Sequence, residues 1–326
     1  MPSEFKITML GPGGVGKTSL LTAMYDRFDT TLDAMNLQFV PDSETAATLT
    51  EKLGQLKSLT DEFEATGGLE RTEDTNSFRF GIGKPGEKSF LKLQFIDYPG
   101  EFMHSNSPKE KRQWVEESIA ESVAVLVAID APVLMEGKGK WHELINRPTQ
   151  IKILFQNVFQ DLQSPKLVIF APVKCEKYLR TEFESEKLIK RIREDKDYQR
   201  LFNLFASESL KDKIVSVITP VQTVGSVVFS RIEEKEKNPY FYFRKISHDA
   251  MYSPQDCEQP LLYLLRFILN LEMKKRKESW RLLGFLRDWL NLDEELVQAL
   301  QKAIVQNNKN TNHKSIVVQG QNWLEI

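Results

Sequence analysis

Cysteine and histidine are scarce in this chain. Its 326 residues include two cysteines and four histidines. The two thiols, Cys175 and Cys257, are too few for a disulfide framework or a cysteine-based zinc site, and the histidines lack the spacing of metal ligands. Low cysteine content is typical of a reducing compartment, and the strand-like start "FKITML" leaves no room for a signal peptide. We therefore expect a cytoplasmic protein.

Long apolar runs and a strong net charge are also missing. The strongest apolar stretch, "VAVLVAI", has the length of a strand and falls far short of the roughly 20 apolar residues of a membrane span. The net charge of −2 provides no overall attraction to nucleic acid or to an anionic membrane. The chain does contain 41% hydrophobic and 28% charged residues, which is the balance of a soluble globular protein with a core. We expect no membrane span and no nucleic-acid partner.

Strands and helices alternate along most of the chain. Apolar runs predict strands at residues 5–10, 77–82, 91–97, 123–130, 166–172 and 213–220. Apolar residues at helical spacing predict helices at 17–28, 45–63, 149–162, 178–205 and 257–277. This alternation predicts an α/β fold with a mostly parallel central sheet and helices on both faces.

The predicted domain organisation is one large domain with additions. Residues 1–276 form the domain, which carries a helical insertion at about 42–64 and a hairpin insertion at about 226–247. Residues 277–326 form a C-terminal helical extension and tail. The tail segment "SIVVQGQNW" could add a strand to a partner's sheet, pack on its own domain, or be disordered.

The stretch "GPGGVGKTS" has the spacing of a phosphate-binding loop. Gly11, Gly16, Lys17 and Thr18 satisfy the pattern G-x-x-x-x-G-K-[ST], with a predicted strand before it and a predicted helix after it. In such a loop Lys17 reaches the β- and γ-phosphates, the Thr18 hydroxyl binds Mg²⁺, and Ser19 lies near the α-phosphate. The alternative is a glycine-rich turn that binds no ligand. The predicted phosphate-binding residues are Gly13, Gly14, Val15, Gly16, Lys17, Thr18 and Ser19.

A second motif, "FIDYPGE", ends a hydrophobic strand about 80 residues later. A carboxylate at a strand end, here Asp97, is where proteins with this loop hold the Mg²⁺ shell. Asp97 and Gly100 also make a D-x-x-G pattern, in which the glycine N–H contacts the γ-phosphate and moves when that phosphate leaves. The alternative is a strand that simply ends in a Pro-Gly turn.

With these two motifs the chain resembles the Ras-like P-loop GTPases of the translation-factor-related class. The resemblance implies that the residue after the D-x-x-G motif orients the attacking water. That residue is a glutamine in the family and Glu101 here, so hydrolysis is expected to be slow or to need a partner's arginine. The resemblance also implies a switch threonine that joins the catalytic and Mg²⁺ sites, either Thr72 or Thr75, and the spacing to the next strand favours Thr72.

The string "VKCE" stands where such GTPases carry the guanine-binding motif N/T-K-x-D. Lys174 is in place, and Glu176 stands where an aspartate accepts hydrogen bonds from guanine; adenine lacks those donors. A last base-contacting turn is expected at "TPVQT", through the backbone of Gln222 or Thr223. The predicted cofactors are therefore GTP or GDP and Mg²⁺.

Taken with "PVKCEKY" and "TPVQTVG", the motifs resemble bacterial double-GTPase proteins of predicted antiviral defence cassettes, over about residues 5–275. The resemblance implies a molecular switch that works with a protein partner or effector encoded nearby. Two other functions remain open from the residues: a P-loop ATPase or small-molecule kinase, although no compact arginine-rich lid is evident, and a nucleotide-binding scaffold that no longer hydrolyses its ligand.

Overall fold

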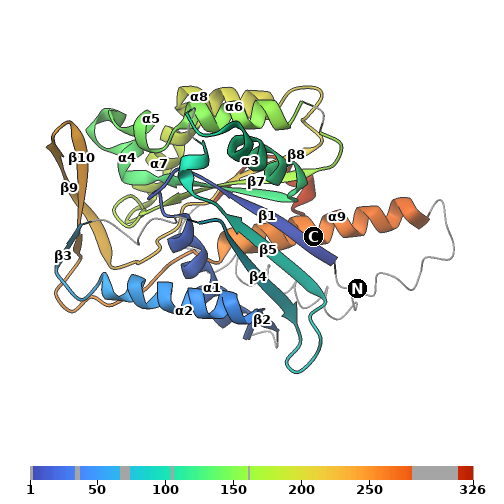
Figure 1. Ribbon diagram of the computed structural model, residues 1–326, viewed down its shortest axis with the longest axis horizontal. Helices are drawn as coiled ribbons and strands as arrows, with labels where there is room; N and C mark the ends of the chain where they lie inside the picture. The colour runs from blue at the N-terminus through green and yellow to red at the C-terminus, as the bar shows by residue number, and fades with distance from the viewer. Residues whose placement is uncertain are drawn as a thin grey trace.

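A twisted central sheet organises the molecule (Figure 1). The computed structural model describes residues 3–33, 37–66, 74–103, 106–160, 162–280 and 315–325. The strand order across this sheet is β11-β8-β7-β6-β1-β5-β4-β2. The strands are β1 (Ser3–Leu10), β2 (Gln38–Pro41), β4 (Asn76–Gly83), β5 (Leu91–Asp97), β6 (Ala124–Asp130), β7 (Lys166–Val173), β8 (Ile214–Ile218) and β11 (Ile316–Gln319). Strands β8, β7, β6, β1 and β5 run parallel, while β4, β2 and β11 join antiparallel at the two edges.

The central strands are continuously apolar because helices cover both of their faces. Every residue of β6 and β7 is buried. Successive side chains of a strand point to opposite faces, so Leu126 joins the core on one side of the sheet and its neighbours Val125 and Val127 join the core on the other.

Helices α1 (Lys17–Asp33) and α9 (Gln259–Trp280) pack on one face, and α3 (Lys109–Glu121), α6 (Pro148–Val158), α7 (Glu182–Glu194) and α8 (Lys196–Phe205) pack on the other (Figure 1). The short helices α4 (Ala131–Met135) and α5 (His142–Ile145) lie beside this second group. The predicted fold class is confirmed. No helix among the described residues has the length and hydropathy of a membrane span.

A smaller sheet, called here the small sheet, stands at one end of the molecule (Figure 1). It consists of β3 (Glu64–Thr66), β10 (Asn238–Lys245) and β9 (Val227–Lys235), in that order. Strands β9 and β10 are the predicted hairpin, whereas β3 was not expected from the sequence. The predicted helical insertion contains α2 (Ser43–Ser58), which begins after Asp42 because the carboxylate of that residue accepts a hydrogen bond from the Thr45 N–H and caps the helix.

Two boundaries differ from the sequence prediction. The single helix expected over 178–205 is wrong, because Asp195 leaves the helical conformation and its carboxylate accepts hydrogen bonds from the N–H groups of Asp197 and Tyr198, which starts α8. The helix expected over 45–63 ends at Ser58, and the chain then enters β3. Strand β2 and helix α3 were not anticipated.

The tail forms the edge strand β11, which pairs antiparallel with β8, so it packs on its own domain. Of the predicted extension, residues 281–314 lie outside the described residues. The boundary expected at 276 falls inside α9, and the division into domain and extension stays a prediction.

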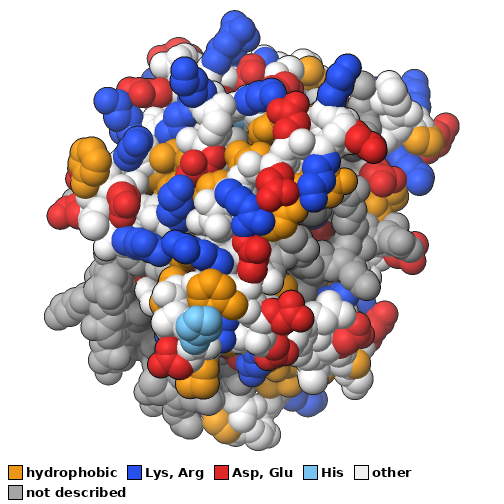
Figure 2. Space-filling model, turned by 90° about the vertical axis from the view of Figure 1, so that its left-hand side faces the viewer, with side chains coloured by type: hydrophobic (Ala, Val, Ile, Leu, Met, Phe, Trp, Pro, Cys, Tyr) orange, Lys and Arg blue, Asp and Glu red, His pale blue; other side chains and the backbone are white. Residues whose placement is uncertain are grey.

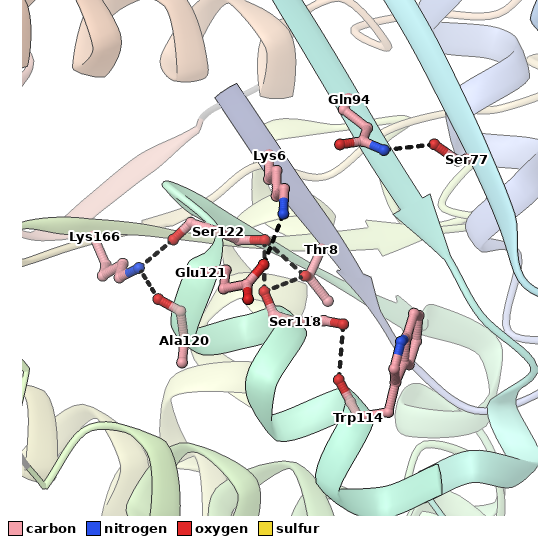
Figure 3. Close-up of polar contacts among 10 residues, drawn as sticks. All are labelled: Lys6, Thr8, Ser77, Gln94, Trp114, Ser118, Ala120, Glu121, Ser122 and Lys166. Carbon is pink, nitrogen blue, oxygen red and sulfur yellow. Dashed lines mark hydrogen bonds and ion pairs between the residues drawn. The ribbon is translucent and has the colours of Figure 1, made fainter. Parts of the chain in front are cut away.

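Polar contacts fix the end of α3 against β1 and β7 (Figure 3). The Lys166 ammonium donates to the carbonyl oxygens of Ala120, at 2.5 Å, and Ser122, where the negative end of the helix dipole favours a cation. Burial lowers the pKa of Lys166 to about 8. The Thr8 hydroxyl donates to the Ser118 carbonyl at 3.0 Å. These contacts hold β1, the strand that leads into the motif-bearing loop.

Candidate functional site

The predicted phosphate loop connects β1 to α1. Gly14 and Gly16 adopt φ angles of 78° and 115°, a region that other residues rarely enter. A Cβ atom at Gly16 would also lie 3.3 Å from the Val173 side chain, at the end of β7. The loop conformation therefore favours glycine at both positions, although the motif itself specifies only Gly16 of the two.

Three motif side chains meet at the start of α1. The Lys17 ammonium lies 3.6 Å from Asp97 Oδ1 and donates to the Gly11 carbonyl at 2.9 Å. The Thr18 hydroxyl donates to Asp97 Oδ2 at 2.7 Å. Asp97 is fully buried and Lys17 is 5% exposed, so burial lowers the pKa of Lys17 while the nearby carboxylate opposes that shift. Strand pairing explains the meeting, because Asp97 is opposite Met9 where β5 runs parallel to β1.

The donor set suits Mg²⁺ shared with a phosphate. Thr18 and Asp97 present a hydroxyl and a carboxylate side by side, and oxygen is the ligand that Mg²⁺ prefers. Within the described ranges, no group of three or more His, Cys, Asp or Glu side chains could hold a metal ion. Mg²⁺ usually takes few protein ligands and completes its shell with water and phosphate oxygens, so the residues fit it. Thr72, the third predicted ligand, lies outside the described residues.

The D-x-x-G corner touches the phosphate loop. A Cβ atom built on Gly100 would lie 1.8 Å from the Gly13 backbone nitrogen, so the two backbones are in direct contact. Gly100 begins a short 3₁₀ helix, Gly100–Met103. Glu101 is the second residue of this helix. Its side chain is exposed, and its backbone carbonyl accepts a hydrogen bond from the Ser107 hydroxyl. Its catalytic role stays a prediction.

Lys174 links three parts of the site. Its ammonium lies 2.5 Å from Asp130 Oδ2, at the end of β6, and 3.3 Å from the Gly14 carbonyl in the phosphate loop. Asp130 is buried, and its other carboxylate oxygen accepts from the Val133 N–H at the start of α4. Sequence reasoning missed Asp130. The sequence did contain one signal for it: Asp130 is a carboxylate at the C-terminal end of a buried strand, and ligands bind at that edge of a parallel sheet.

Glu176 is almost fully buried beside the last predicted turn. One of its carboxylate oxygens accepts hydrogen bonds from the N–H groups of Val224 and Gly225, at 3.0 and 3.1 Å. Burial raises the pKa of Glu176, and the backbone hydrogen bonds oppose this. In the same turn the Gln222 amide donates to the Gln255 side chain at 3.0 Å. Glu176 thus positions the turn in addition to any contact with a base.

A pocket that opens to solvent adjoins the phosphate loop. Thr223 lines it, together with residues of the predicted phosphate and base motifs. Two apolar walls come from the inserted segments, which the sequence did not assign to the site. The lining residues are Gly16, Ser19, Leu56, Leu59, Val173, Lys174, Glu176, Thr223, Val224, Val227 and Phe243.

Comparison with known proteins agrees with the motifs. The model of a protein family described as Double-GTPase 2 matches residues 6–217. That match contains the phosphate loop, the D-x-x-G corner and the "VKCE" string. None of the curated proteins matches the chain.

Solved structures with a similar chain path include three GTPase or GTPase-like proteins. A signal recognition particle receptor SRb-GTP/SRX complex from Chaetomium thermophilum is 16% identical, with 69% of this chain and 93% of that chain covered and a TM-score of 0.37. The S. cerevisiae Ski7 GTPase-like domain, bound to GTP, is 12% identical, with coverage of 68% and 43% and a TM-score of 0.37. Era in complex with MgGDPNP and nucleotides 1506–1542 of 16S ribosomal RNA is 15% identical, with coverage of 73% and 76% and a TM-score of 0.34.

Proposed function

Because this chain belongs to the Double-GTPase 2 family of GTP-binding and GTP-hydrolysing proteins, we propose that it is a Mg²⁺-dependent molecular switch of the cytoplasm. We further propose that it acts with a protein partner or effector in an antiviral defence system. The resemblance of its motifs to double-GTPases of such systems supports this second part.

One observation carries the switch proposal: Gly100 lies directly against Gly13 of the phosphate loop. A phosphate held by the loop therefore lies next to the D-x-x-G corner, whose backbone can respond to the presence or loss of the γ-phosphate. In this proposal Lys17 binds the β- and γ-phosphates. Thr18 and Asp97 hold Mg²⁺, which neutralises charge on the phosphates when it is bound.

The proposed hydrolytic step uses Glu101 to orient the attacking water, with Thr72 as the second switch residue. The exposed position of Glu101 supports a role that is completed by a partner, since solvent-facing groups are poorly oriented without one. A partner's arginine could supply the missing charge, and such a residue typically contributes ~10³–10⁵ in rate.

Isothermal titration of nucleotide-free protein tests the guanine assignment. We expect GDP to bind on the order of 100-fold more tightly than ADP, because Glu176 can accept from guanine but would meet no such donors on adenine. Tighter binding of ADP would refute the assignment.

The Mg²⁺ requirement is tested with Thr18→Val, which removes the hydroxyl but keeps the side-chain shape. We expect loss of Mg²⁺-dependent phosphate release in this variant. Thr22→Val is the matched control: its hydroxyl, one turn further along α1, donates to the Thr18 carbonyl at 2.8 Å and takes no part in the proposed ion site. Equal activity of the two variants would contradict the proposal.

A further inference from the structure

The pocket beside the phosphate loop extends the nucleotide site into the inserted segments. Gly16 and Ser19 line its inner end, together with Lys174. Because residues of both the phosphate loop and the base motifs line this one opening, a nucleotide whose phosphates occupy the loop can place its base in it.

The outer walls of this pocket are apolar and come from two insertions. Leu56 and Leu59 belong to α2 and its C-terminal cap, while Val227 and Phe243 belong to the hairpin. Phe243 is 8% exposed, and the Lys174 ammonium lies 5.8 Å from the centre of its ring. A flat heteroaromatic ring suits such walls, because an aromatic side chain offers it a stacking surface while polar groups read its edge.

The two walls are joined to each other. Leu56, Val227, Phe229 and Phe243 belong to one buried cluster, which also includes Val224 of the last base-motif turn. The Lys245 N–H and ammonium donate to carbonyls of the segment between α2 and β3, at 2.9 and 2.8 Å. α2 and the small sheet therefore form one unit that faces the pocket.

Figure 2 views the molecule from the side that carries the small sheet, and basic, acidic and hydrophobic side chains are intermixed there. The buried apolar cluster of the unit, by contrast, meets the pocket through Leu56, Val227 and Phe243.

We propose that the base of the bound nucleotide lies between α2 and the β9–β10 hairpin, with Phe243 stacking on it and Leu56 closing the opposite wall. Base binding then stabilises the docking of α2 and the small sheet on the nucleotide domain. This inference rests on the proposed nucleotide site at residues 11–19.

The test compares GDP with inorganic tripolyphosphate, which carries phosphates but no base. By titration calorimetry in Mg²⁺, Phe243→Ala should weaken GDP binding roughly 10- to 100-fold, as expected for loss of one stacked aromatic ring. Its affinity for tripolyphosphate should equal that of the wild type. Leu56→Ala should give a smaller loss for GDP, within about 10-fold, and again none for tripolyphosphate.

Phe229→Ala is the matched control, because Phe229 belongs to the same cluster and meets Phe243 edge-on at 6.1 Å but does not line the pocket. It should change GDP affinity by less than about 3-fold. Phe243→Leu, which keeps apolar bulk, guards against unfolding and should retain part of the GDP affinity.

Hydrogen exchange gives an independent readout of docking. In the wild type, amides of α2 and of residues 227–245 should exchange more slowly with GDP than with tripolyphosphate. Equal protection by both ligands overturns the docking step.

Several results overturn the inference as a whole. One is an unchanged GDP affinity in Phe243→Ala. Another is a loss of GDP affinity in Phe229→Ala equal to that in Phe243→Ala, and the third is a parallel loss of tripolyphosphate affinity in Phe243→Ala. Such results would indicate packing damage, or occupation of the pocket by something other than the base. Failure of the wild type to bind GDP would instead refute the proposed nucleotide site itself.

Discussion

Replacing Lys17 with alanine removes the cation that faces Asp97 inside the phosphate site. The carboxylate is fully buried, with the Lys17 ammonium 3.6 Å from one oxygen and the Thr18 hydroxyl 2.7 Å from the other. Removing one partner of a buried ion pair typically costs about 3–5 kcal/mol. At about 2–4 °C per kcal/mol for a large domain, the melting temperature of the nucleotide-free protein should fall by roughly 6–20 °C.

A double variant separates this structural cost from the functional one. In Lys17→Ala combined with Asp97→Asn, the buried group is neutral and no longer needs a cation, so most of the lost melting temperature should return. Binding of GDP should not return, because the charge that holds the phosphates is still missing.

An exposed ion pair supplies the control. Lys6 and Glu121 are closer, at 2.7 Å, but their side chains are 42% and 61% exposed. Exposed pairs typically contribute about 0–1 kcal/mol. Lys6→Ala should therefore shift the melting temperature by at most a few degrees and leave GDP binding unchanged.

Thermal unfolding followed by circular dichroism, together with calorimetric titration of GDP, measures all of these variants. The reasoning about the buried pair would be refuted if the melting temperature of Lys17→Ala equalled that of the wild type. It would also be refuted if the double variant had a lower melting temperature than Lys17→Ala. GDP affinity retained in Lys17→Ala would contradict the assignment of the phosphate loop.

Three further outcomes are expected. Gly100→Ala places a Cβ atom 1.8 Å from the Gly13 nitrogen, where real contacts stay above 3.0 Å, so the D-x-x-G corner must move by about 1.2 Å. GTP hydrolysis, measured by phosphate release, should then fall by about 100-fold, and a wild-type rate would contradict this. Glu101→Ala should lower the rate of phosphate release, by up to roughly 100-fold where a partner orients the wild-type side chain. Because the side chain is exposed, the melting temperature of this variant should match the wild type; undiminished release both with and without a partner would leave Glu101 without the proposed role. Burial raises the pKa of Asp256 to about 7 from 3.8, with the Glu258 charge adding to the effect. The folded state then holds this proton more tightly, so the stability from this group is full below about pH 4 and is lost as the pH rises to about 7, by roughly 4 kcal/mol at most. Asp256→Asn should therefore melt like the wild type near pH 4 and higher than it at pH 8, and parallel pH profiles would show that the group is not responsible.

The phosphate loop was predictable because its determinants are local. Nine consecutive residues fix its backbone through glycines, and the strand before it and the helix after it follow from apolar periodicity. Asp97 was predictable for a related reason: it ends a hydrophobic strand, and strand ends meet at one edge of a parallel sheet.

Asp130 and Phe243 were not predictable, because their roles depend on contacts between distant parts of the chain. Asp130 reaches Lys174 across 44 positions in sequence, through the pairing of β6 with β7. Phe243 lines the pocket only because the hairpin docks against α2, which no local pattern encodes. Thr72 and most of the C-terminal extension lie outside the described residues and stay predictions.

The break at Asp195 shows a limit of periodicity. Apolar residues keep helical spacing through 178–205, so the pattern indicates one helix. The helix is divided by a single polar side chain, that of Asp195, which accepts hydrogen bonds from backbone N–H groups. For the tail, the sequence left open a strand on a partner's sheet, packing on its own domain, and disorder, and no local pattern identifies β8 as the strand it joins.

The edge strand β11 has a practical consequence for measurement. It pairs with β8, and the Asn270 amide of α9 donates to the Glu325 carbonyl at 2.9 Å, so the chain beyond β11 is fastened to the central scaffold. A dye on the exposed side chain of Gln321, just after β11, would thus report a fixed position at the opposite edge of the sheet from β4 and β2. With a second dye on the tip of the β9–β10 hairpin, the distance between the two dyes would report opening and closing of the base pocket in single molecules.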